Sequence, residues 1–279
     1  MSHPAPPVTW FFFDRDALLA RADRYRDEFV RAEPFSHVVL DDFLPEDALD
    51  ALLREFPEPG EAGWRRRDVA HERKLGLSDE TAMGPNTRHV LQQLNSQVFL
   101  EFLERITGID GLIPDPHFVG GGLHQIVPGG LLKIHADFNR HQRLALDRRL
   151  NLLLYLNRDW NDTYGGHLEL WDRSMTVCRQ RVLPIFNRCV IFATSEESYH
   201  GHPDPLTCPP GRARRSMALY YYTAPGENAD APFHTTLFRP RPSDAPVQRP
   251  GRARRAARRV LPPVVLDVAR AIRRRPGSS

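Results

Sequence analysis

The chain has 279 residues, of which 41% are hydrophobic and 26% charged, and its formal net charge is +3. This length allows one large domain with a substantial core, a size that all-β folds often reach as a single unit. No stretch approaches the roughly 18 apolar residues of a transmembrane helix, and the start lacks the pattern of a secretory signal. Three cysteines without paired spacing argue against a disulfide framework or a zinc site, so we expect a cytoplasmic protein.

Residues 1–111 are expected to form a support region of helices and a strand. Hydrophobic periodicity and helix-stop signals predict helices over residues 14–30, 45–56 and 87–107 and a strand over 37–43. Gly108 is the natural stop of the last helix. The polar segment 57–79 is interpreted as a solvated loop, and an active-site flap is the alternative.

Residues 112–225 contain short runs rich in Val, Ile, Leu, Phe and Tyr, separated by Gly, Pro and Asn. The expected strands cover residues 131–134, 150–156, 167–171, 175–182, 188–193 and 216–223. Many short strands of this kind favour a sandwich or jelly roll over βαβ units. The expected fold class is therefore mainly β with flanking helices (α+β), in which the N-terminal helices pack outside the β core and brace it.

His135 and Asp137 are two residues apart at the end of one expected strand. Side chains at this spacing point to the same face of a strand, so an imidazole and a carboxylate could bind one metal ion together. His200, sixty-five residues on, is the candidate third ligand. Two His and one carboxylate form the facial triad of non-haem Fe(II) oxygenases, which leaves three positions open.

A rival H-x-D motif lies at residues 202–204, with His234 downstream as its candidate third ligand. Pro203 and Pro205 flank Asp204 and remove backbone donors, so this segment should not lie inside a hydrogen-bonded sheet. We interpret it as a loop and prefer the first set of ligands.

The order of HADF, LLLYLN, GGHLEL, VIFATSEESYHGHP and RRSMALYYYT resembles the 2-oxoglutarate- and Fe(II)-dependent oxygenase superfamily, in the branch that includes prolyl 4-hydroxylases. The resemblance covers roughly residues 112–225. It implies a double-stranded β-helix (a jelly roll) that holds Fe(II) by His135, Asp137 and His200, with no catalytic residue beyond these ligands. It also implies 2-oxoglutarate as co-substrate and O2 as oxidant, and ascorbate is an additional candidate cofactor.

In that family a basic residue near the start of the last core strand pairs with the distal carboxylate of 2-oxoglutarate. Strand alternation puts Arg212 and Arg214 on one face and Arg215 on the other. The family usually has the basic residue six positions before an aromatic, and Tyr220 stands six after Arg214. This spacing favours Arg214, with Arg212 as runner-up and a solvated arginine run as the plain alternative. The planar fork of arginine matches a carboxylate.

Four further residues are candidates for co-substrate or substrate contacts. Tyr155 matches a family position whose hydroxyl reaches the 2-oxoglutarate carboxylate, although a structural hydrogen bond is the alternative. Asn151 shares the strand face of Tyr155 and is expected to help orient the co-substrate. Gln125, on the approach strand, and Asn139 are candidate substrate contacts.

Residues 226–279 form a Pro- and Arg-rich tail. Ten Arg and one Asp lie within residues 249–275, a net +9 in a chain whose total is +3, so the remainder is acidic. Residues 264–272 are compatible with a short basic helix that touches an anionic surface. Nucleic-acid binding is the alternative, although the tail lacks interleaved aromatics.

The sequence therefore predicts a dioxygenase that oxidises, and by default hydroxylates, an unactivated C–H, with release of succinate and CO2. A small-molecule substrate is favoured because long peptide-binding extensions are not evident. A protein hydroxylase acting on prolyl or other side chains is the alternative, because fold and cofactor do not fix the substrate. A non-enzymatic jelly-roll binding protein is the alternative from another class.

Overall fold

The structure, a computed structural model, describes residues 11–61, 63–226 and 232–244. The chain divides into two units, Met1–Pro242 and Ser243–Ser279, and every helix and strand below lies in the first. None of the described helices combines the length and the apolar character needed to cross a membrane. The predicted helix at residues 264–272, with the rest of the Arg-rich tail, lies outside the described residues.

Four α-helices lie within residues 15–107, where the hydrophobic periodicity predicted three. They are α1 (Arg15–Arg31), α2 (Glu46–Arg54), α3 (Pro85–Leu94) and α4 (Gln97–Thr107). The single helix predicted over 87–107 is wrong, because Asn95 ends α3 and Ser96 caps α4. The Ser96 hydroxyl accepts from the Phe99 N–H at 3.4 Å, and short polar side chains favour such caps over helix interiors. Gly108 ends α4 at a φ of 73°, as predicted.

Fourteen strands, paired antiparallel throughout the described residues, form one curled sheet. Ten of them follow the path β1-β11-β8-β13-β5-β3-β6-β12-β9-β10. The strands are β1 (His37–Leu40), β2 (Arg65–Val69), β3 (Glu72–Leu77), β4 (Ile113–Pro114), β5 (Gly122–Ile126), β6 (Leu131–Ala136), β7 (Arg140–His141), β8 (Leu146–Tyr155), β9 (Leu168–Trp171), β10 (Cys178–Val182), β11 (Cys189–Ala193), β12 (His200–His202), β13 (Arg214–Thr223) and β14 (Leu237–Phe238).

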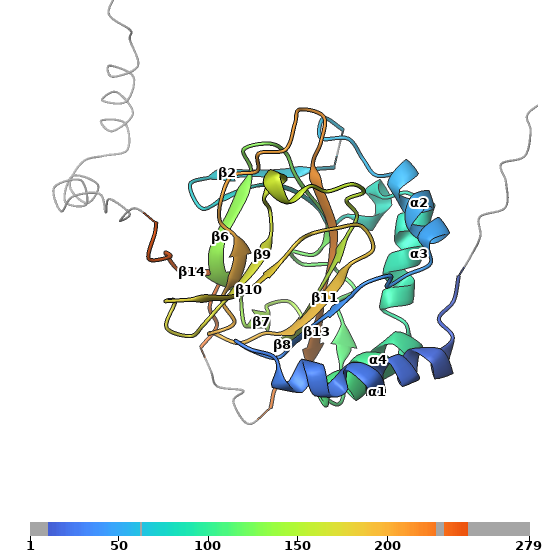
Figure 1. The fold of residues 1–279 in the computed structure, drawn as a ribbon. Coiled ribbons are helices and arrows are strands. Elements are labelled where there is room, and N and C mark those ends of the chain that lie inside the picture. The colour runs from blue at the N-terminus through green and yellow to red at the C-terminus, as the bar shows by residue number, and fades with distance from the viewer. Residues whose placement is uncertain (1–10, 62, 227–231, 245–279) are drawn as a thin grey trace, which may run out of the picture. The chain divides into compact units, whose positions relative to one another are not determined.

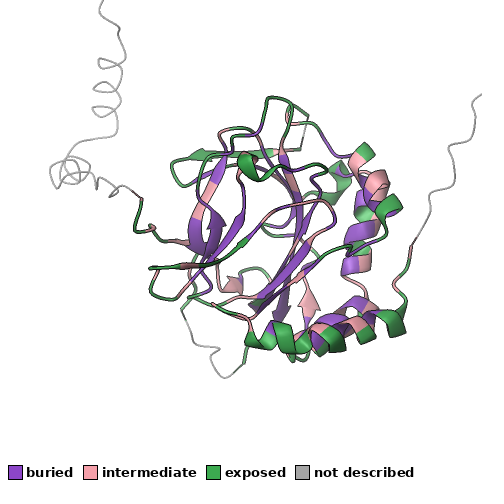
Figure 2. Ribbon diagram, viewed as in Figure 1, coloured by how far each residue is buried: buried purple, intermediate pink, exposed green. Residues whose placement is uncertain are grey.

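The helices cover the outer face of the sheet beside β8, β11 and β13 (Figure 1). Leu150, Leu152 and Leu154 of β8 are fully buried in the core shared with the helices. The alternate residues, Asn151 and Tyr155 among them, face the inside of the curled sheet, as strand alternation requires. In Figure 2 the strands are mostly buried, and the helices are exposed on their outer side. The mainly β jelly-roll architecture with bracing helices is thus confirmed.

The β2–β3 hairpin and β14 are among the parts of the sheet where no strand was predicted. The solvated loop predicted over 57–79 is wrong for most of its length, because β2 and β3 pair as a hairpin and β3 pairs with both β5 and β6. Every residue of β2 is exposed, so the segment carries no apolar alternation that would mark a strand. Strand β14 pairs with β6, beyond residue 225 where the core was expected to end.

Candidate active site

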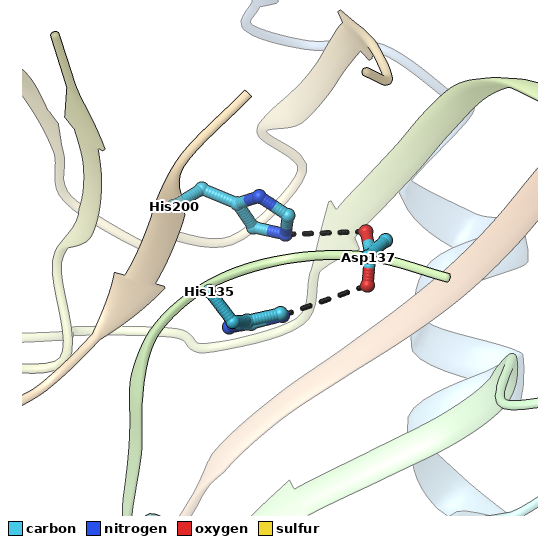
Figure 3. A group of neighbouring side chains, drawn as sticks. All are labelled: His135, Asp137 and His200. Atoms are coloured by element: carbon cyan, nitrogen blue, oxygen red, sulfur yellow. Dashed lines mark ion pairs between the residues drawn. The ribbon is translucent and has the colours of Figure 1, made fainter. Parts of the chain in front are cut away.

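Three predicted ligands converge at the end of β6. His135 lies in β6, Asp137 follows directly after it, and His200 opens β12 as the Cα partner of His135. One ligand atom from each residue lies within 4.8 Å of the other two. Nε2 of His135 is 3.5 Å from Oδ1 of Asp137, and Nε2 of His200 is 3.4 Å from Oδ2 (Figure 3). These residues could hold one metal ion.

Both imidazoles are fixed by the backbone in a metal-binding orientation. Nδ1 of His135 donates to the Lys133 carbonyl at 2.8 Å, and Nδ1 of His200 donates to the Ser198 carbonyl at 2.9 Å. A carbonyl oxygen only accepts, so the proton of each neutral ring lies on Nδ1 and the lone pair lies on Nε2. Burial, assisted by the nearby His135, lowers the pKa of His200 to about 4. The ring is therefore neutral at physiological pH, the state that binds metals.

Asp137 is held by two side chains from β8. Nδ2 of Asn151 donates to Oδ2 of Asp137 at 2.6 Å, and Nη2 of Arg148 lies 3.2 Å from the same oxygen. Arg148 also donates to Oδ1 of Asn151, from Nε at 3.0 Å and from Nη2 at 2.5 Å. Burial alone would raise the pKa of Asp137, but Arg148 and the two imidazoles outweigh it and hold that pKa well below its usual range.

Arg148 is a site residue that the sequence did not predict. Its side chain is only 1% exposed. The β8–β13 register shifts at this point, pairing Leu150 with Tyr221 but Arg148 with Tyr222. A bulge of this kind puts Arg148 on the same face as Asn151, three residues on, against simple alternation. The guanidinium carbon also lies 3.5 Å from the centroid of the Tyr220 ring. No sequence signal marks such a bulge.

Arg214 is the buried arginine at the start of β13. It is 4% exposed, its Nε donates to the Gly166 carbonyl at 2.8 Å, and its Nη2 donates to the Tyr155 hydroxyl at 3.2 Å. Burial lowers the pKa of Arg214 and raises that of Tyr155. Among the described residues no carboxylate lies within ion-pair distance of Arg214. Arg212 is exposed and donates to a backbone carbonyl, and Arg215 pairs with Glu58.

A cavity of about 640 Å³ connects the three ligands to Arg214. Its lining contains His135, Asp137, His200, Arg214 and Asn151. Cavities of roughly 300–1,000 Å³ are typical of sites for small molecules.

Two candidate contacts lie elsewhere. Gln125 is not among the cavity-lining residues, while His124 and Ile126 on either side of it line the cavity, so its role as a substrate contact stays a prediction. Asn139 braces the segment after residue 231: its Nδ2 donates to the Pro232 carbonyl at 3.0 Å, and its Oδ1 accepts from the His234 N–H at 3.1 Å.

Two buried histidines of the cavity were not singled out as site residues. His124 and His202 both line it, and burial is the largest cause that lowers the pKa of each well below the usual value. Both ring nitrogens of His202 lack a hydrogen-bond partner among the described residues. His202 ends β12, so this part of the rival motif is a strand rather than a loop, whereas Asp204 is exposed and pairs with Arg241 at 2.6 Å.

Residues 121–222 match the model of a family described as the 2OG-Fe(II) oxygenase superfamily. The matched region resembles this superfamily, and the protein is a dioxygenase of the oxidoreductase class. The family name states the metal and the co-substrate, Fe(II) and 2-oxoglutarate. The predicted resemblance is therefore confirmed, and the non-enzymatic alternative is not supported. No curated protein sequence matches this chain.

Solved structures of similar fold include prolyl hydroxylases. A Pseudomonas putida prolyl-4-hydroxylase is 18% identical, with a TM-score of 0.51 over 75% of this chain and 100% of that chain. A Trichoplax adhaerens prolyl hydroxylase, in complex with a hypoxia inducible factor peptide fragment, is 17% identical, with a TM-score of 0.54 over 76% and 94%. A Phytophthora capsici prolyl 4-hydroxylase is 20% identical, with a TM-score of 0.51 over 77% and 67%. These similarities support the jelly-roll fold of the prolyl 4-hydroxylase-like branch.

Proposed function

We propose that His135, Asp137 and His200 hold Fe(II), that Arg214 and Tyr155 bind the distal carboxylate of 2-oxoglutarate, and that the enzyme oxidises a C–H of a small molecule. The observation that carries this proposal is the buried guanidinium of Arg214, which lines the same cavity as the three ligands. No carboxylate pairs with it among the described residues.

The donor set fits Fe(II). Two imidazole nitrogens and one carboxylate oxygen are the ligands of the facial triad, and three protein ligands leave positions open for a chelating co-substrate and O2. The hydrogen bonds from Nδ1 of each imidazole to a backbone carbonyl orient both rings before any ion binds.

Arg214 fits a carboxylate of the co-substrate. A buried guanidinium without an anionic partner is costly, and a carboxylate accepts its parallel N–H groups. The Tyr155 hydroxyl already accepts from Arg214 and has its own proton to donate, so both residues can bind one carboxylate.

Bound Fe(II) supplies the activation of O2 that couples decarboxylation of 2-oxoglutarate, to succinate and CO2, with oxidation of the substrate. The chain positions the reactants: Arg214 and Tyr155 fix one end of the co-substrate, and Asn151 and Arg148 fix the carboxylate of Asp137. Hydroxylation of an unactivated C–H is the default outcome. Ascorbate remains an untested additional cofactor, and cytoplasmic location remains a prediction.

A contact across the cavity supports a small substrate. His71, in the turn of the β2–β3 hairpin, and Phe238, in β14, both line the cavity, and their ring centroids are 4.0 Å apart. The contact between the His71 and Phe238 rings narrows the cavity, which favours a compact ligand over an extended polypeptide. A protein hydroxylase is the second candidate, because the similar folds include a prolyl hydroxylase in complex with a peptide.

The proposal is tested by anaerobic titration of the full chain with Fe(II) and 2-oxoglutarate, followed by assay of succinate in air. The wild type should develop a metal-to-ligand charge-transfer band and form succinate. His135→Ala and Asp137→Ala should lose both, because each removes a ligand. His234→Ala removes the candidate third ligand of the rival motif and serves as the control. It should retain both the charge-transfer band and succinate formation. The assignment of the ligands is wrong if His135→Ala or Asp137→Ala keeps succinate formation.

A further inference from the structure

We infer that the substrate carries a carboxylate or phosphate group, which binds to a cationic wall of the cavity formed by Arg65, Arg67 and Lys74 of the β2–β3 hairpin. This inference rests on the proposed function, because it places the acid group in the cavity that holds the three metal ligands. It names a substrate class that the family match leaves open.

Strand alternation aims one face of the hairpin at the cavity. Arg65 and Arg67 of β2 line it, whereas Arg66 between them does not. On β3 the lining residues are Glu72, Lys74 and Gly76, again alternate positions. The register pairs Arg65 with Gly76 and Arg67 with Lys74, so the two strands present these side chains on a shared face.

The charges on this face do not balance. Arg67 lies directly opposite Lys74, and like charges at such positions destabilise a pair of strands. Glu72 lies between them, 3.6 Å from Nε of Arg67 and 3.3 Å from Nζ of Lys74, and compensates one charge. Arg65 has no ion-pair partner among the described residues. Three cations and one carboxylate leave this wall with a net charge of +2.

The rest of the cavity reinforces the preference for an anion. The only acidic residues among its lining residues are Glu72 and Asp137, and Asp137 belongs to the metal site. The side chain of Lys74 is only 16% exposed, so its charge is directed into the cavity rather than into solvent. When 2-oxoglutarate occupies Arg214, the remaining Arg and Lys side chains among the lining residues are those of the hairpin. These side chains attract an anionic group of the substrate.

His202 adds a polar contact inside the same cavity. It is 4% exposed, and its two ring nitrogens have no hydrogen-bond partner among the described residues. Buried polar groups are normally paired, so an unpaired imidazole that lines a cavity indicates a polar ligand. The cavity therefore combines a cationic wall with at least one unused hydrogen-bonding group.

The test is calorimetric titration of the full chain, kept anaerobic and saturated with Fe(II) and 2-oxoglutarate so that Arg214 is occupied. The probes are phenyl phosphate, phenylacetate and the uncharged benzyl alcohol. At least one anion should bind, more weakly at high salt, and benzyl alcohol should not bind. The double variant Arg65→Gln/Arg67→Gln should weaken anion binding at least about tenfold, as expected for losing charged hydrogen bonds.

Arg66→Gln is the control for position, because it removes one positive charge from the opposite face of β2, and binding should stay within about twofold of wild type. A preference for one anion distinguishes a phosphate ester from a carboxylic acid as the substrate class. The inference is overturned if neither anion binds, if benzyl alcohol binds as well as the anions, or if Arg66→Gln weakens binding as much as the double variant. If the anion inference fails but the wild type still binds Fe(II) and 2-oxoglutarate, the proposed oxygenase function stands. If the wild type binds neither Fe(II) nor 2-oxoglutarate, both the proposed function and the anion inference are refuted. Single variants, at exposed positions, replace the double variant if it unfolds.

Discussion

Replacing Asn151 by Leu should loosen the metal site without changing any metal ligand. The substitution removes the hydrogen bond from Nδ2 to Asp137, at 2.6 Å, and the acceptor of two N–H groups of Arg148. Hydrogen bonds to charged groups contribute about 1.5–3 kcal/mol each. Nη2 of Arg148 keeps Asp137 as a partner, so two such bonds are lost outright and unfolding should become about 3–6 kcal/mol easier. Loss of groups that orient metal ligands typically weakens metal binding by about 10–100-fold, or about 1.4–2.8 kcal/mol.

Asn157 supplies the matched control, because it is a buried asparagine just after β8 and outside the metal site. Its Nδ2 donates to the Pro184 carbonyl at 2.7 Å, and its Oδ1 accepts from the Arg215 N–H at 2.7 Å. Asn157→Leu should therefore cost a comparable amount of folding stability but leave Fe(II) affinity within about twofold, since none of its partners orients a ligand.

The two variants are compared by urea denaturation and by anaerobic calorimetric titration with Fe(II). Weaker Fe(II) binding in Asn151→Leu alone supports a positioning role for Asn151. Equal loss of affinity in both variants would show that the effect is general destabilisation, and unchanged affinity in Asn151→Leu would refute the reasoning.

Three other outcomes are expected. Arg214→Met should raise the KM for 2-oxoglutarate by at least about 30-fold, because truncating one partner of a buried charge pair costs about 2–5 kcal/mol. Arg212→Gln, at an exposed position, should leave the KM unchanged, and an equal effect of both would contradict the assignment. Burial holds the pKa of His124 in the folded protein well below its ordinary 6.5. As the pH drops below 6.5, the unfolded chain takes up a proton that the folded chain does not, so His124 lowers the stability of the fold. From pH 7.5 to 5.5 this contribution lowers the free energy of unfolding by about 1.4 kcal/mol. Urea denaturation of His124→Gln at the two pH values should therefore show a loss of stability about 1.4 kcal/mol smaller than in the wild type, and an equal loss would disprove the prediction. Phe238→Ala should destabilise the fold by only about 1–2 kcal/mol, since the ring is half-buried. It should raise the ratio of succinate to oxidised substrate, because Phe238 lines the substrate cavity. A ratio equal to that of the wild type would argue against a substrate contact at Phe238.

The strands of the β core could be predicted because their apolar residues carry the signal. In β8 the residues that face the helices are leucines, and the ends of the strand are marked by polar turns. Alternation separated Arg214 from Arg215, and the family spacing to Tyr220 favoured Arg214. Strand β2 could not be found this way, because Arg65 to Val69 are all exposed and the strand is held by backbone pairing to β3.

The candidate ligands could be found because they occupy a short motif at a strand end, and His200 follows in family order. Residues that act through other residues carry no such mark. Arg148 reaches Asp137 through a register shift in β8, which depends on the pairing with β13. For Asn151 the strand face was predicted, but its hydrogen bond to Asp137 depends on where the loop after β6 lies in space.

Two parts of the cavity lining, the β2–β3 hairpin and β14, come from outside residues 121–222, the region that matches the family model. The hairpin of β2 and β3 precedes that region and β14 follows it, and β14 pairs with the strand that contains His135. The proposed metal ligands and the proposed anion-binding hairpin thus lie in different stretches of the chain. A protein trimmed to the matched region would keep His135, Asp137 and His200 but lose Arg65, Arg67 and Phe238, so engineering of specificity should begin in these flanks.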